Sequence, residues 1–131
     1  MRVDFDPHGE CEIEVVDDII VIHAHGPWNL ELSRNMHRQL AQVAEQYAEN
    51  NTYLLICLKG EAIAGEDVIN EHIKFIGYRR ATAVALEFSQ CSTTQITQNI
   101  FSRIYELTQQ KYRFFDNQEQ AMSWLKQLQA E

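Results

Sequence analysis

The chain has 131 residues, a hydrophobic fraction of 45% and a formal net charge of −8. This length and apolar content favour a single domain over residues 1–131 and exclude general disorder. The acidic balance argues against nucleic acid as a partner, because phosphate binding needs a concentrated basic surface. No apolar stretch approaches the roughly 20 residues that cross a bilayer, and residues 1–6 lack the core of a secretory signal, so we expect a cytoplasmic protein.

The first elements expected are two paired strands. Residues 11–16 alternate acidic and apolar side chains, and residues 19–24 are rich in β-branched side chains. Both patterns are typical of strands, and the two residues between them, Asp17 and Asp18, suit a tight turn. The sequence therefore predicts an antiparallel hairpin.

A helix is expected next, from Asn29 or Leu30 to about residue 49, with Asn29 as its N-cap. Its apolar side chains recur at helical spacing, at Leu32, Met36, Leu40, Val43 and Tyr47. Residues 53–58 are apolar at every position, which is typical of a central buried strand. Residues 59–65 are expected to form a loop.

The second helix is expected to begin at Glu66 and Asp67, where carboxylates suit the positive end of the helix dipole. Gly77 is expected to follow its last turn as a C-terminal cap. Its inner face is predicted to consist of Ile69, Ile73 and Ile76.

A further strand is expected at residues 81–86, with Ala81, Ala83 and Ala85 on one face. Small side chains there leave room for a helix or a ligand close to the sheet. A third helix is expected to start at Ser92 or Thr93, with an inner stripe of Ile96, Ile100, Ile104 and Leu107.

The chain is expected to close with a strand at residues 111–115 and an amphipathic helix. Asp116 and Glu119 have the spacing of a capping box. The order β-β-α-β-α-β-α-β-α predicts an α/β fold with a mostly parallel five-stranded sheet, an N-terminal antiparallel hairpin and four helices.

Four strings carry a resemblance to a known family: Gly26-Pro-Trp-Asn, Leu54-Leu-Ile-Cys-Leu-Lys-Gly60, Ala83-Val-Ala-Leu and Phe114-Phe-Asp-Asn-Gln-Glu-Gln-Ala-Met-Ser-Trp-Leu125. With the order of elements, they resemble the SpoIIAA-like proteins, related to STAS anti-sigma-factor antagonists and to CRAL-TRIO lipid-binding domains. The resemblance covers nearly the whole chain. It implies a (βα) superhelical sheet with strands in sequence order, and either a regulatory protein-interaction role or the binding of an apolar ligand.

One departure bears on the regulatory role. The anti-sigma-factor antagonists carry a phosphorylatable serine in the loop after the central strand, whereas no Ser or Thr occurs between Tyr53 and Ala81 here. A phosphoserine switch needs a hydroxyl group to modify. A STAS-like interaction module would therefore act without phosphorylation, and its partner is expected to meet the loop at Gly60, Glu61, Gly65 and Glu66.

Candidate catalytic and metal-binding residues are few. His23 and His25 share one face of a strand and, with His37 or His72, could ligate a metal, but no third ligand follows from their spacing. The acids Glu61, Glu66 and Asp67 suit a helix N-terminus without any acid–base role. We expect no metal, no cofactor and no enzymatic activity.

The three cysteines, Cys11, Cys57 and Cys91, form no CxxC pair and are expected to be reduced. Cys57 lies in an apolar strand and is expected to pack as a small hydrophobic side chain. Cys91 is expected to lie in a loop and to be more accessible, although the sequence assigns it no histidine partner.

The segment from Ile73 to Arg80 interleaves basic and aromatic side chains in an otherwise acidic chain. Such a patch can contact a membrane surface, and cations also suit a helix C-terminus. The candidate membrane-contact residues are Lys74, Phe75, Tyr78, Arg79 and Arg80. They would allow peripheral contact with the inner face of the membrane.

The leading hypothesis is a non-enzymatic module that holds a small apolar or lipid-like ligand between the sheet and the second and third helices. The alternative is the STAS-like protein-interaction module described above. Apolar and aromatic residues at the predicted sheet end and on the two helices are the expected lining of the ligand site: Trp28, Ile73, Ile76, Ile100, Phe101 and Ile104.

Overall fold

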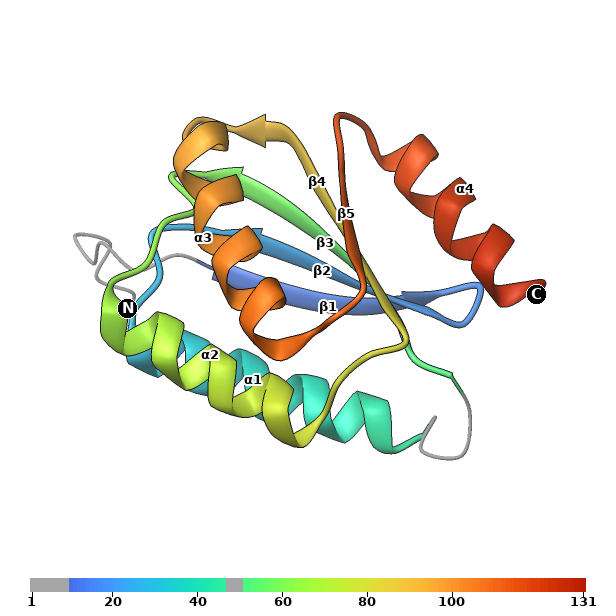
Figure 1. Ribbon diagram of the computed structural model, residues 1–131, viewed down its shortest axis with the longest axis horizontal. Helices are drawn as coiled ribbons and strands as arrows, with labels where there is room; N and C mark the ends of the chain where they lie inside the picture. The colour runs from blue at the N-terminus through green and yellow to red at the C-terminus, as the bar shows by residue number, and fades with distance from the viewer. Residues whose placement is uncertain (1–9, 47–50) are drawn as a thin grey trace, which may run out of the picture.

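The computed structural model describes residues 10–46 and 51–131. They form five strands and four helices in the predicted order (Figure 1). The predicted helix end near residue 49 and the inward position of Tyr47 lie outside the described residues. The elements are β1 (Glu10–Val16), β2 (Ile19–His25), α1 (Leu30–Glu45), β3 (Tyr53–Gly60), α2 (Glu66–Tyr78), β4 (Ala83–Cys91), α3 (Thr94–Thr108), β5 (Tyr112–Phe115) and α4 (Gln118–Gln129).

The strands lie in sequence order, β1-β2-β3-β4-β5, with β1 antiparallel to β2 and the remaining neighbours parallel. The turn between β1 and β2 places Asp17 and Asp18 at φ 53° and 62°. Two successive left-handed residues are what a two-residue hairpin turn requires, since they match the twist of the paired strands. The prediction of a mostly parallel sheet with an N-terminal hairpin is confirmed.

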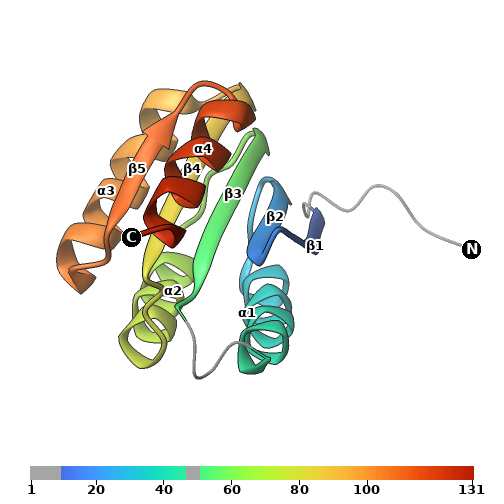
Figure 2. The same cartoon turned by 90° about the vertical axis from the view of Figure 1, so that its right-hand side faces the viewer.

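Three helices cover one face of the sheet and one covers the other (Figures 1 and 2). Each crossover from β2 to β5 moves one strand in the same direction, so right-handed connections place α1, α2 and α3 on the same side. No strand follows α4 among the described elements, and this helix folds back onto the opposite face.

The sheet separates two apolar clusters. The larger joins alternate residues of β2, β3 and β4, such as Ile22, Ile56 and Leu86, to the inner faces of α1, α2 and α3. The smaller joins the intervening strand residues to Ala121 and Leu125 of α4. Because the central strands are buried on both faces, they are apolar at nearly every position.

Of the two roles predicted for the alanine face, the structure shows the close approach of a helix and not a ligand. Ala83 and Ala85 are fully buried against the α4 side, whereas their neighbours Val84 and Leu86 face the three-helix side. Ala81 precedes the strand and does not share this face with them. Ala83 and Ala85 therefore admit α4 close to the sheet and do not border the space beneath α2 and α3.

The predicted inner stripe of α3 was wrong at both of its ends. Ile96 and Leu107 are 58% and 65% exposed, and Thr97 and Tyr105 are buried instead. Thr97 can be buried because its hydroxyl group donates a hydrogen bond to the Ala62 carbonyl at 2.9 Å. Thr97, with its hydrogen bond to Ala62, therefore lies on the buried face of α3, and the adjacent Ile96 lies on the exposed face.

Two predicted helix ends also differ. Asn117, and not Asp116, caps α4, because its side chain accepts the N–H of Gln120 at 2.8 Å. Gly77 lies within α2, which continues to Tyr78, with Arg79 as its C-cap. Loop composition alone does not decide between adjacent capping residues, which is why helix ends are the least predictable feature.

Candidate functional site

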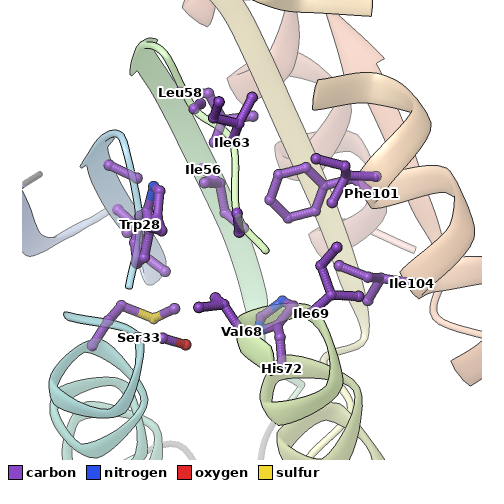
Figure 3. Close-up of a pocket in the computed structure, with 16 residues that line it drawn as sticks. Trp28, Ser33, Ile56, Leu58, Ile63, Val68, Ile69, His72, Phe101 and Ile104 are labelled. Atoms are coloured by element: carbon purple, nitrogen blue, oxygen red, sulfur yellow. The ribbon is translucent and has the colours of Figure 1, made fainter. Parts of the chain in front are cut away.

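An apolar cavity of about 60 Å³ lies between the sheet and the three-helix layer (Figure 3). Sixteen residues line it. Of the side chains that line it, those of Trp28, Ser33 and His72 carry polar atoms, and the others are apolar. The members are Ile22, Ala24, Trp28, Ser33, Met36, Ile56, Leu58, Ala62, Ile63, Ala64, Val68, Ile69, His72, Ile100, Phe101 and Ile104.

At the carboxyl edge of the parallel strands, the segments that follow β2 and β3 line the first cavity. Trp28 and Ala64 form an isolated parallel β-bridge, and the main-chain N–H of Trp28 donates to the Ile63 carbonyl at 3.0 Å. Gly26 allows this approach, because a Cβ atom built there would lie 1.9 Å from the Glu61 carbonyl oxygen. The partly buried Trp28 ring is thereby held over the cavity.

A second, larger cavity of about 410 Å³ lies on the same side of the sheet, toward the start of β3 and β4. It shares four lining residues with the first cavity: Ile22, Met36, Ile56 and His72. Its interior is lined by side chains such as Leu40, Leu54 and Val84, whereas its rim includes Arg79 and Arg80. The two cavities therefore border the same short section of the sheet, with His72 in the wall between them.

His72 is paired with His37 of α1. His37 Nε2 lies 2.7 Å from His72 Nδ1, and the His37 ring stacks on Phe75 with ring centroids 4.1 Å apart. Burial lowers the pKa of His72 to about 3, an effect that nearby His37 reinforces. Burial also lowers the pKa of His37 to about 4, although Glu71 opposes this shift. Both imidazoles are neutral at neutral pH.

The predicted ligand residues divide among these spaces. Trp28, Ile100, Phe101 and Ile104 line the first cavity, and Ile76 lines the second. Ile73 lines neither and packs at the edge of the larger apolar cluster. The sequence reasoning missed His72, which borders both cavities. Its position one residue before Ile73 offered no signal, since helical spacing alone does not show which neighbouring helix meets it.

Four of the five predicted membrane-contact residues line the second cavity. Phe75, Tyr78, Arg79 and Arg80 line it, whereas Lys74 does not. Tyr78 is 91% exposed. The guanidinium groups of Arg79 and Arg80 donate to the main-chain carbonyls of Ala41 and Thr108, each at 3.5 Å. Phe75 is stacked on His37 and is partly buried, so it is less available for contact with a surface than Tyr78.

The predicted partner loop is fixed at both ends. Gly60 has a φ of 64°, a left-handed conformation that favours glycine, and its carbonyl accepts the Ser92 N–H. At the other end Glu66 forms a bidentate ion pair with Arg103 at 2.7 and 2.8 Å, which lowers the pKa of that carboxyl group. Between them Glu61 and Gly65 are exposed.

The remaining candidates for chemistry are dispersed. His23 pairs with Glu14 at 3.3 Å, and His25 bonds to the adjacent Gly26 carbonyl. Within residues 10–46 and 51–131, no group of three or more His, Cys, Asp or Glu side chains is placed to hold a metal ion. His37 and His72, which the sequence offered as a third metal ligand, form a hydrogen bond with each other.

The cysteines are free thiols in different surroundings. Burial raises the pKa of Cys57 to about 12, so it packs as an apolar side chain in the α4-side cluster. Cys91 is partly exposed at the end of β4 and not in a loop as predicted, because this strand continues beyond residue 86 and pairs with β3 as far as Gly60. Although burial alone would raise its pKa, hydrogen bonding with the Thr93 backbone and with the Thr97 hydroxyl group lowers the pKa overall.

The arrangement of strands and helices is a SpoIIAA-like fold. No family model matches the chain. No curated protein sequence matches it.

The chain is similar to an uncharacterized protein of the DUF3478 family with a SpoIIAA-like fold from Shewanella loihica PV-4. The TM-score is 0.63, the sequence identity is 18%, and the match covers 95% of this chain and 99% of that one. At this identity the likeness establishes the fold alone. In the described part of the chain, no helix has both the length and the apolar character needed to span a membrane.

Proposed function

We propose that the protein is a non-enzymatic binding module that holds a small apolar or lipid-like molecule between the sheet and its three-helix layer. The observation that carries this proposal is the pair of adjoining cavities, because they are concave and lined mainly by apolar side chains, as small-molecule sites usually are. The SpoIIAA-like fold, typical of non-enzymatic, STAS-like modules in general, is consistent with a binding role.

Replacing Ile100 with Trp is expected to abolish ligand retention. Ile100 is partly buried and lines the first cavity, so a larger ring there would fill the space that the ligand needs. The matched control is Ile96→Trp, which adds the same side chain to the exposed outer face of the same helix. Native mass spectrometry of freshly purified protein, followed by denaturing extraction, measures the occupancy of each variant.

The expected result is a stoichiometric extra mass in the wild-type protein and in Ile96→Trp, released as a lipid-like compound, and its loss from Ile100→Trp. The proposal is overturned if the wild-type protein is ligand-free and also binds no apolar probe in solution. The STAS-like interaction module would then be the better hypothesis, since the fixed loop from Gly60 to Glu66 would present Glu61 to a protein partner.

The rim of the second cavity suggests how a ligand could be exchanged. Arg79, Arg80 and the exposed Tyr78 border that opening, and two cations with an aromatic ring suit an anionic bilayer surface. We propose transient peripheral contact with a membrane through this rim. The net charge of −8 makes such contact local, because the rest of the chain is repelled by anionic lipid.

The double variant Arg79→Glu with Arg80→Glu is expected to lose binding to vesicles of anionic phosphatidylglycerol. At roughly 1 kcal/mol per basic residue near the surface, removing two cations should weaken binding at least about tenfold. Arg38→Glu with Arg113→Glu changes the net charge equally at two exposed positions away from the rim and is the control. Equal vesicle sedimentation of the two double variants would exclude the rim as the contact surface.

A further inference from the structure

The wall between the two cavities contains a polar atom whose hydrogen-bonding capacity is not used. Nε2 of His72 is inaccessible to solvent and has no hydrogen-bond partner among the described residues. Figure 3 shows the ring projecting from α2 toward the cavity, with Val68 and Ile69 on either side. Buried polar atoms are almost always paired, because an unpaired one costs about 1–3 kcal/mol of desolvation.

The contact with His37 restricts what Nε2 can do. If His37 Nε2–H donates to His72 Nδ1, the neutral His72 ring carries its proton on Nε2 and presents a donor to the cavity. If instead His72 Nδ1–H donates to His37, Nε2 is a bare acceptor. A hydroxyl group, which both donates and accepts, can pair with Nε2 in either arrangement.

An ionised group is a poor match for this position. Burial keeps both imidazoles neutral at neutral pH, so neither supplies a positive charge. The side chains around His72 in the first cavity are apolar apart from Trp28 and Ser33. A carboxylate placed there would be desolvated without a cation, which costs far more than burying a neutral hydroxyl group.

We infer that the ligand is an apolar molecule with a neutral hydroxyl group, and that this group hydrogen-bonds to His72 Nε2. The inference rests on the proposed function, since it assigns the polar contact within the same cavities. It makes His72 the residue that selects an alcohol over a hydrocarbon or a carboxylate, while the apolar walls supply most of the binding free energy.

The test uses three probes with the same ring: toluene, benzyl alcohol and benzoate. Their dissociation constants for the wild-type protein, His72→Phe and His25→Phe are measured by NMR titration of the isoleucine methyl groups. In His72→Phe, binding of benzyl alcohol relative to toluene is expected to weaken about 3- to 10-fold, the value of one neutral hydrogen bond. His25→Phe is the matched control, because His25 is exposed, lines neither cavity and does not contact His72.

A second measurement needs no variant. The ¹⁵N chemical shift of His72 Nε2 in the wild-type protein is expected to move on addition of benzyl alcohol and to stay in place with toluene. If toluene binds and benzyl alcohol neither shifts Nε2 nor responds to His72→Phe, the inference is wrong while the proposed function stands. Tighter binding of benzoate than of benzyl alcohol would also overturn it. If none of the probes binds and native mass spectrometry finds the protein ligand-free, the proposed function itself fails.

Discussion

Lowering the pH from 7 to 4.5 is expected to remove about 3–5 kcal/mol of folding stability through His37 and His72 alone. Both histidines have depressed pKa values in the folded protein, about 4 and about 3, because burial disfavours their charged forms. The unfolded chain takes up protons near pH 6.5, where the folded protein does not. The folding stability that depends on these two histidines is therefore fully present above about pH 6.5. It falls as the pH decreases and stops changing below about pH 3, where both are also protonated in the folded protein.

Urea unfolding followed by tryptophan fluorescence at pH 7, 6, 5 and 4.5 measures this effect. The double variant His37→Phe with His72→Phe is the control, since replacing both partners of a buried pair by apolar rings of similar shape is often nearly neutral. Its stability is expected to depend less on pH, by up to about 1.4 kcal/mol per pH unit for each histidine. Parallel pH profiles for the two proteins would show that the pair is accessible to protons in the folded state.

Replacing Gly26 with Ala is expected to destabilise the protein by roughly 3 kcal/mol or more. The added Cβ atom would lie 1.9 Å from the Glu61 carbonyl oxygen and 2.7 Å from the Ala62 Cα atom. Both are main-chain atoms, so relief requires the loop after β3 to move away from the loop after β2. That movement would also displace Trp28 from the first cavity.

Replacing Gly77 with Ala is expected to have the opposite effect and to increase the stability of the protein. No atom lies within 4 Å of a Cβ atom built at Gly77, which lies within α2, so alanine should stabilise the helix by up to about 1 kcal/mol. Chemical denaturation of both variants measures the contrast. A cost below about 1 kcal/mol for Gly26→Ala would mean that the two loops are not held together as tightly as their contact implies.

The sheet and its strand order were predictable because the relevant signals are local. Residues 53–58 are apolar at every position, and the pair Asp17 and Asp18 fits a hairpin turn; both features appear directly in the sequence. The faces of α3 were less predictable. Ile96 and Leu107 fit the periodicity as well as Thr97 and Tyr105 do, and only the Ala62 carbonyl, 35 residues before Thr97, decides which stripe is buried.

The candidate site was predictable only in part for the same reason. Trp28, Phe101 and Ile104 are large apolar residues at the sheet end or on an inner helix face, positions that cavities often use. The pairing of His37 with His72 joins two helices 35 residues apart in the chain. No periodicity within either helix specifies the offset at which α1 and α2 pack, so the contact follows from tertiary packing alone.

The division of the core by the sheet gives the molecule two separate optical reporters. Trp28 borders the first cavity on the three-helix side, and Trp124 packs on Phe115 in the α4-side cluster, with ring centroids 5.7 Å apart. The sequence contains these two tryptophans and no other. Emission from a protein that retains only Trp28 would follow events within the cavity, and emission from one that retains only Trp124 would follow the docking of α4.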